Sequence, residues 1–280
     1  MSYLKRSSAI LFLLTIFFTS CKEQPKNESE GDMNAQTKEV SVIGEDLTYR
    51  ADTTQLKGYI AFDENATGKA PGILVVHEWW GHNEYARERA EMLAELGYVA
   101  LAVDMYGNGK TADHPEKAQE FSGMVMQNID VGRQRFEAAM EALKQHPRVN
   151  GEKIAAIGYC FGGSVVLTMA NAGYDLDAVA AFHSGVQLPI MPTDSLTAKV
   201  LICNGAEDPF VTPESVAAYT RAMDSLGADY KYVAYENAQH SFTSKAADSL
   251  GKKFELPLSY NAEADEKSRS ELKELLNRSF

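Results

Sequence analysis

A cysteine in a glycine-rich turn is the residue of this chain best placed to do chemistry. Cys160 lies within the segment GYCFGG (158–163), directly after the apolar run 154–157 and directly before the helix-like run 164–170. Glycines at the flanking positions let neighbouring backbone segments approach closely, as a strained turn between a strand and a helix requires. The pattern therefore predicts an exposed, attacking thiol on a nucleophile elbow, with cysteine in place of the usual serine.

An acid and a histidine follow the cysteine in the chain order that an α/β-hydrolase uses. Asp208 comes 48 residues after Cys160, and His240 comes 32 residues after Asp208, each on a loop behind a predicted strand. Taken alone, an Asp before a proline is typical of a turn and a loop His is typical of the surface. Their joint order with the elbow predicts a triad, in which His240 takes the thiol proton and Asp208 holds the imidazole.

The elements that would position these residues alternate between strand and helix. Strands are predicted at residues 40–43, 47–50, 56–62, 72–76, 98–103, 154–157, 178–182, 200–203 and 230–234. Helices are predicted at residues 84–96, 115–127, 133–145, 164–172, 213–226 and 264–277. Apolar strands separated by helices predict an α/β-hydrolase fold, a mostly parallel sheet with helices on both faces. The carboxyl edge of such a sheet is expected to gather Glu78, Asp104, Cys160, Asp208 and His240.

Four motifs together resemble the dienelactone hydrolase family, across residues 40–280. They are the elbow at 158–163, an acid loop at 205–208, a histidine loop at 239–242, and a glutamate after the first buried parallel strand in HEWWG (77–81). The resemblance implies a hydrolase of carboxylic ester, thioester or lactone bonds that forms an acyl-enzyme on Cys160 and needs no cofactor. Two alternatives remain open: peptide or amide hydrolysis on the same fold, and a lipoprotein that only binds a ligand.

The same resemblance assigns further roles at the site. The backbone N–H groups of Trp79 and Phe161 are expected to form the oxyanion hole. Glu78 is expected to contact the resting thiol and keep it protonated; the alternative is a buried pair with Arg87 or Arg89.

The remaining aromatic and histidine residues near these motifs are interpreted as pocket or structural residues rather than as catalytic ones. Trp80 and Tyr159 are expected to line the substrate pocket. His77 and His82 superficially resemble a zinc-protease signature, but they are five residues apart rather than four and follow a strand, so no metal site is predicted. His183 is interpreted as a satisfied polar residue rather than a second base.

The substrate-binding arginines of the family's name-giving enzymes have no counterpart in this sequence. Four residues after His240 stands Ser244, with Lys245 adjacent, and residues 107–132 contain Lys110 and Lys117 but no arginine. Lysine does not reproduce the bidentate fork that arginine offers a carboxylate. We therefore expect neutral esters to be better substrates than anionic ones.

The N-terminal region is typical of a targeting segment rather than of a folded domain. Lys5 and Arg6 precede an apolar run at 9–18, which ends in Thr-Ser-Cys at 19–21. The pattern predicts a lipoprotein-type signal at residues 1–21 ending at an acylated Cys21, then a flexible tether at 22–39. The protein is accordingly expected to be exported and lipid-anchored to a bacterial membrane, on the periplasmic side or the cell surface. The alternative is an ordinary cleaved signal with a chance cysteine.

Charge and cysteine content narrow the possible partners. Residues 1–20 hold two of the 27 basic residues, so the mature chain keeps 25 against 39 acidic residues, a net charge of −14. Because this negative charge repels the phosphates of nucleic acid, nucleic acid is a poor partner. A small-molecule ester or lactone is the expected ligand. Beyond Cys21 only Cys160 and Cys203 remain. They do not form a disulfide framework, and Cys203 is expected in the core.

Overall fold

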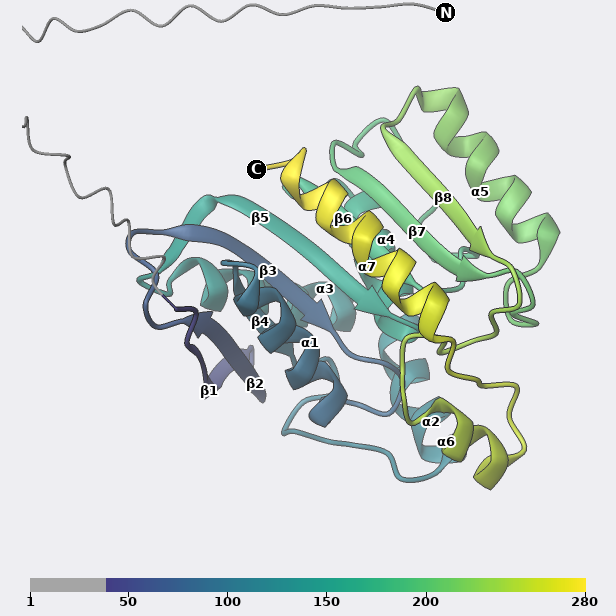
Figure 1. The fold of residues 1–280 in the computed structure, drawn as a ribbon, viewed down its shortest axis with the longest axis horizontal. Coiled ribbons are helices and arrows are strands. Elements are labelled where there is room, and N and C mark those ends of the chain that lie inside the picture. The colour runs from purple at the N-terminus through teal and green to yellow at the C-terminus, as the bar shows by residue number, and fades with distance from the viewer. Residues whose placement is uncertain (1–38) are drawn as a thin grey trace, which may run out of the picture. The chain divides into compact units, whose positions relative to one another are not determined.

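A mixed eight-stranded sheet organises residues 39–280, the part of the chain that the computed structural model describes (Figure 1). The strand order is β1-β2-β4-β3-β5-β6-β7-β8. β1 and β2 pair antiparallel, as do β2 and β4, whereas every pair from β4 through β3 to β8 is parallel. The parallel strands consequently end at one edge of the sheet, and the predicted α/β-hydrolase fold is confirmed.

The elements follow one another along the chain much as predicted. The strands are β1 (Val42–Ala51), β2 (Thr54–Asp63), β3 (Ala70–Val76), β4 (Val99–Val103), β5 (Val149–Tyr159), β6 (Ala178–Phe182), β7 (Lys199–Gly205) and β8 (Tyr230–Tyr235). The helices are α1 (Glu84–Glu95), α2 (Pro115–Met126), α3 (Ile129–Lys144), α4 (Phe161–Asn171), α5 (Pro213–Leu226), α6 (Ala247–Phe254) and α7 (Ala262–Asn277).

Helices cover both faces of the sheet, each over its own apolar core. On one face, α1 and α7 bury side chains against the strands, among them Ala90, Leu93 and Leu276 (Figure 1). On the other face, α3, α4 and α5 do the same, with Phe136 and Tyr219 wholly buried. Strands buried on both sides must be apolar throughout, which is why β4 reads VALAV with every residue buried.

Two differences from the sequence-based prediction change the number of elements. The segments expected at 40–43 and 47–50 form one strand, β1, because its polar middle is exposed at the sheet edge and still pairs residue by residue with β2. α6 was not expected, because Gly251 and two lysines interrupt its apolar pattern.

The predicted signal, Cys21 and nearly all of the predicted tether lie outside the described residues. Within residues 39–280 the helices are all too short or too polar to cross a bilayer.

Candidate active site

The turn at Cys160 has a strained backbone. Cys160 sits between β5 and α4 with φ 53° and ψ −116°, a conformation that surrounding packing must hold in place. Gly162 supplies part of that packing, because a Cβ atom there would lie only 2.2 Å from the carbonyl oxygen of Val76 at the end of β3. The elbow is therefore held tightly against the neighbouring strand.

The acid and the histidine are joined by a direct hydrogen bond. Nδ1 of His240 donates to Oδ2 of Asp208 over 2.7 Å, and both side chains are buried. Oδ1 of the same carboxylate accepts the backbone N–H of Phe210 over 2.9 Å, which fixes its orientation. The two loops meet closely at Gly205, where a Cβ atom would lie 2.2 Å from the carbonyl oxygen of Ala238. This close approach of the two loop backbones thus fixes the position of Asp208 relative to His240.

The charge state of His240 responds to Cys160. Burial acts to lower the pKa of His240, but its interactions with Cys160 and with Asp208 outweigh burial and raise the pKa to about 10. Cys160 and His240 also line one cavity. The structure thereby brings together the three residues that the sequence order singles out.

Two backbone N–H groups beside the elbow are free to bind an oxyanion. Phe161 is the first residue of α4, so its N–H has no partner within the helix, and Trp79 lies in the turn that follows β3. Within residues 39–280 neither N–H donates a hydrogen bond to another group. Both residues line the cavity that contains Cys160.

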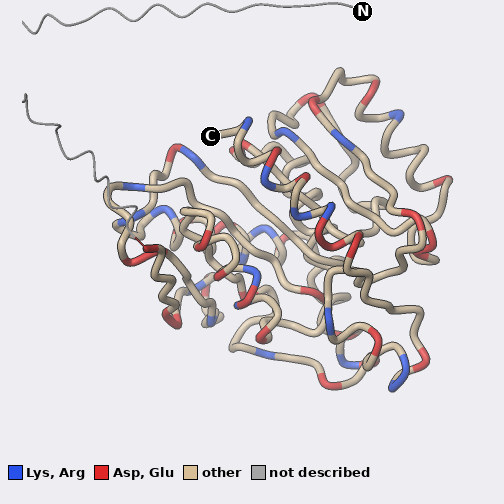
Figure 2. Tube along the Cα trace, viewed as in Figure 1, with Lys and Arg blue, Asp and Glu red and all other residues tan. Residues whose placement is uncertain are grey.

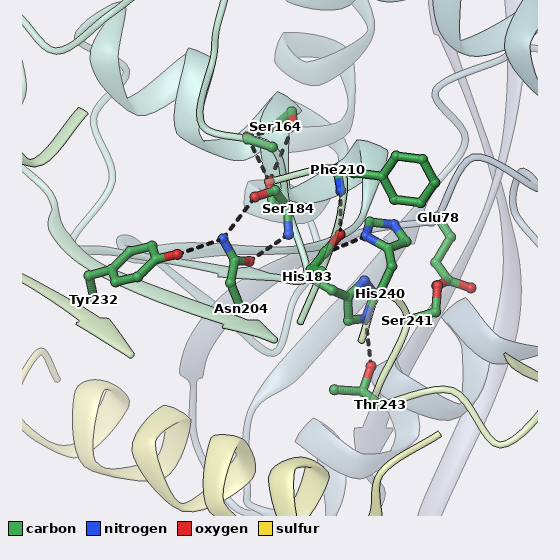
Figure 3. A network of polar contacts seen from close by, with 12 residues as sticks. Glu78, Ser164, His183, Ser184, Asn204, Phe210, Tyr232, His240, Ser241 and Thr243 are labelled. Atoms are coloured by element: carbon green, nitrogen blue, oxygen red, sulfur yellow. Dashed lines mark hydrogen bonds and ion pairs between the residues drawn. The ribbon is translucent and has the colours of Figure 1, made fainter. Parts of the chain in front are cut away.

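Glu78 is buried beside the histidine loop. Its Oε1 accepts a hydrogen bond from Oγ of Ser241 over 3.0 Å (Figure 3). Burial raises the pKa of Glu78, against the opposing effects of Ser241, His240 and Arg89. The ion pairs of the two candidate arginines lie elsewhere: Arg87 pairs with Asp46 at 2.8 Å and Arg89 with Asp265 at 3.6 Å.

The cavity beside Cys160 is mostly apolar and has a volume of about 310 Å³. Its apolar walls come from Trp79, Met126, Phe161, Phe210, Leu256 and Leu258, and its polar contributors include Ser122 and Ser164.

Trp80 and Tyr159, which we expected at the pocket, do not line this cavity, and that expectation is corrected. Trp80 is buried between Trp79 and Phe254. Tyr159 is buried against Tyr85 and Phe182 on the other face of the sheet, because the side chain before the elbow points opposite to that of Cys160.

A network of buried polar side chains lies behind the site (Figure 3). His183 contacts Oγ1 of Thr243 through Nε2 at 2.8 Å, and its ring packs edge-on against His240. Burial holds the pKa of His183 well below its usual range, so the ring is neutral. Asn204 accepts the Ser184 N–H and donates to the Ser184 carbonyl, which ties the end of β7 to the end of β6.

The other residues considered from the sequence lie away from the cavity. The Asp104 carboxylate is buried and accepts four backbone N–H groups, those of Lys57, Tyr106, Gly107 and Gly109, so it shapes the turn after β4. Cys203 lies in the core, where burial raises its pKa to about 12.

Among residues 39–280, no Asp, Glu, Lys or Arg lines the cavity, and His240 and Cys160 are its only titratable side chains. Lys110 and Lys117 lie over the ring of Phe121, and Lys245 lines a separate groove beside α1. Charges of both signs are interspersed along residues 39–280, without a basic stripe (Figure 2). Among the same residues, no group of three or more His, Cys, Asp or Glu side chains is placed to hold a metal ion.

Sequence reasoning missed seven cavity residues. Four have large apolar side chains: Met126 from α2, Phe210 after the acid, and Leu256 and Leu258 after α6; the other three are Ser122, Ser164 and Gly185. Only Phe210 carried a signal in the sequence, since this aromatic residue stands two residues beyond Asp208.

Comparisons with known proteins show which family this chain and its fold resemble. A model of the dienelactone hydrolase family matches residues 56–280. A carboxymethylenebutenolidase of Pseudomonas putida is 30% identical over 185 residues, which cover 63% of this chain and 77% of that protein. A solved structure described as m3DLH is 35% identical, with a TM-score of 0.81, and the match covers 85% of this chain and 99% of that one. A dienelactone hydrolase-like promiscuous phosphotriesterase from metagenomic libraries is 34% identical, with a TM-score of 0.79 and the same coverage.

Proposed function

The chain belongs to the dienelactone hydrolase family and is a hydrolase of ester or lactone bonds, and we propose that it works through a Cys160–His240–Asp208 triad and an acyl-enzyme. The observation that carries this proposal is the strained Cys160 turn, which shares one cavity with an Asp208-bonded His240. Carboxylic esters, thioesters and lactones are the proposed substrate class.

Acylation begins with proton transfer from the Cys160 thiol to His240, whose Asp208 partner stabilises the resulting imidazolium. The thiolate attacks the substrate carbonyl carbon, and the carbonyl oxygen becomes an oxyanion that the N–H groups of Trp79 and Phe161 bind. When the tetrahedral intermediate collapses, the C–O bond to the alcohol breaks. His240 returns its proton to that alcohol, which leaves a thioester on Cys160.

Deacylation repeats these steps with water as the nucleophile. His240 takes a proton from the water, whose oxygen attacks the thioester carbon, and the same two N–H groups bind the second oxyanion. Collapse releases the carboxylic acid and returns the proton to the sulfur of Cys160. The reaction consumes one water and needs no cofactor.

Glu78 controls the nucleophile in this proposal. A buried carboxylate close to Cys160 disfavours the thiolate, whereas its proximity to His240 favours the imidazolium. The Ser241 hydrogen bond supports this proposal, because it holds the buried Glu78 side chain beside the histidine loop, where it interacts with His240.

A pair of cysteine variants tests the nucleophile directly. Cys160→Ala should lower turnover of a neutral aryl ester by at least about a thousandfold, because the triad acts as a unit. Cys203→Ala, the matched control in the core, should stay within about twofold of wild type. Equal losses in both variants, with folding intact, would refute the assignment.

Amide hydrolysis is the rival reaction on the same residues. His240 would have to protonate an amine, which is a much poorer leaving group than an alcohol. A matched ester and amide of one acyl group separate the two: we expect ester turnover to exceed amide turnover by several orders of magnitude.

We also propose that lipid on Cys21 anchors the protein to a membrane on the exported side. Several acyl chains on one residue hold a protein stably at a bilayer, whereas one chain binds marginally. Wild type should fractionate with membranes and Cys21→Ala should not. A freely soluble wild type with an unmodified N-terminus would contradict this.

A further inference from the structure

The buried histidine before Glu78 has no part in the triad, yet it touches both halves of the oxyanion site. His77 is wholly buried at the end of β3. Its Nδ1 lies 2.6 Å from the carbonyl oxygen of Glu78, and its Nε2 lies 3.3 Å from the backbone nitrogen of Met105. A carbonyl only accepts and a backbone N–H only donates, so these partners place the ring proton on Nδ1.

The Glu78 carbonyl belongs to the same peptide unit as the N–H of Trp79, one of the two oxyanion donors. Any hydrogen bond accepted by that carbonyl polarises the peptide and strengthens its N–H as a donor. The carbonyl accepts two such bonds, from His77 and from the N–H of Gly81 at 3.1 Å. These bonds also fix the orientation of the peptide plane before substrate arrives.

The other face of the histidine meets the second donor residue. The His77 ring stacks on the Phe161 ring, with centroids 5.6 Å apart and planes 25° apart. Tyr106 packs edge-on against His77 at 4.7 Å, and its hydroxyl donates to the Trp79 carbonyl over 2.8 Å. The wholly buried histidine therefore packs on Phe161 directly and is linked to Trp79 through Tyr106, and both Phe161 and Trp79 line the cavity.

We propose that His77 is a positioning residue that aligns and polarises the oxyanion-binding N–H of Trp79. This role rests on the proposed acyl-enzyme function. Burial lowers the pKa of His77 to about 4, which keeps the ring neutral and its Nε2 available to the N–H of Met105. The histidine thus acts through a backbone peptide and does not touch the substrate.

Two amide variants separate the two ring nitrogens. His77→Asn places an amide near Nδ1 and can still donate to the Glu78 carbonyl, whereas His77→Gln places it near Nε2 and can serve only Met105. We expect His77→Gln to lower kcat for a neutral aryl ester about 10- to 100-fold with KM within about twofold, and His77→Asn to stay within about threefold of wild type. His82→Asn, a buried histidine five residues on without these contacts, serves as the control and should match wild type.

Alkylation of Cys160 by iodoacetamide distinguishes oxyanion binding from general damage to the elbow. Alkylation needs the thiolate but develops no carbonyl oxyanion, so its rate should be the same within about twofold in wild type and in all three variants. The inference is overturned if His77→Gln keeps wild-type kcat, if it slows alkylation as much as ester turnover, or if His82→Asn loses as much. A wild type without Cys160-dependent turnover would overturn the proposed function, and this inference with it.

Discussion

The two sides of the cavity are built in different ways. We call the ends of β3, β5, β7 and β8, with the turns that follow them, the strand-end region; it carries Glu78, Cys160, Asp208 and His240. We call α2 and the segment 255–258 after α6 the cavity wall; it carries Met126, Leu256 and Leu258.

Backbone contacts fix the strand-end region, whereas side chains of ordinary type form the wall. A Cβ atom at Gly162 would overlap a neighbouring backbone, but one at Gly123 in α2 would meet only Gln127, at 3.5 Å. The strand-end region therefore tolerates little change without losing its chemistry. Side chains of the cavity wall can be replaced without altering the reaction. We therefore assign catalysis to the strand-end region and substrate specificity to the cavity wall.

Paired glycine substitutions should produce the largest contrast in stability. We expect Gly162→Ala to lower the free energy of unfolding by about 3 kcal/mol or more, because a backbone carbonyl cannot move away cheaply. Gly123→Ala should raise it by up to about 1 kcal/mol, as alanine favours a helix. Urea unfolding measures both. Similar changes at the two sites would remove the contrast between the regions.

The charge of the substrate should produce the next largest effect, and this effect depends on the residues that line the cavity. No Lys or Arg among residues 39–280 lines the cavity, so a substrate carboxylate finds no charge-assisted partner. We expect kcat/KM for a neutral ester to exceed that for the same ester with an acyl-side carboxylate by about ten- to a hundredfold. A preference for the carboxylated ester would mean that a cation such as Lys245 or Lys110 reaches the site.

The dependence of kcat/KM on acyl-chain length should reveal a smaller contribution of the cavity wall. Leu256→Ala removes apolar surface from the cavity, so kcat/KM for an octanoyl ester should fall about tenfold while that for an acetyl ester changes less than about twofold. Leu226→Ala, on α5 away from the cavity, is the matched control. An equal loss for both esters would place Leu256 in the catalytic part of the molecule instead.

The pH dependence of stability also has a source in the strand-end region. Burial lowers the pKa of His82 from 6.5 to about 4. Between these values the unfolded chain binds a proton that the folded chain does not, so stability falls as pH falls, by about 1.4 kcal/mol per pH unit.

Urea unfolding of His82→Asn at several pH values between 4 and 6.5 measures that contribution. In this pH range, the free energy of unfolding of the variant should change with pH less steeply than that of wild type, by about the slope that one proton contributes. Above pH 7 the two proteins should show the same pH dependence. An unchanged slope would mean that His82 titrates alike in both states.

The sequence predicted the strand-end region better than the wall for a physical reason. Cys160, Asp208 and His240 each follow a strand, and Gly162 and Gly205, where close approach demands glycine, stand near Cys160 and Asp208, so the order and spacing of the triad can be recognised in the sequence. Leu256 and Leu258 follow a short helix with a central glycine, and nothing in their residue types says which surface they cover. Trp80 and Tyr159 were misplaced because an aromatic residue suits a core as well as a pocket.

The interior contacts of His77 could not be read from the sequence either. Its partners are a carbonyl one residue away and the N–H of Met105 on the neighbouring strand end, 28 residues on. Only the folded sheet brings Met105 to the ring. The HEWWG motif thus marked the place but not the role of this histidine.

The most direct test of the proposed chemistry is to trap the acyl-enzyme. Wild type would be mixed with an activated neutral ester, quenched in acid, digested and analysed by mass spectrometry. The account predicts one acyl group, carried as a thioester by the peptide that contains Cys160, and none on Cys160→Ala. An acyl group on another residue, or wild-type turnover by Cys160→Ala, would contradict it.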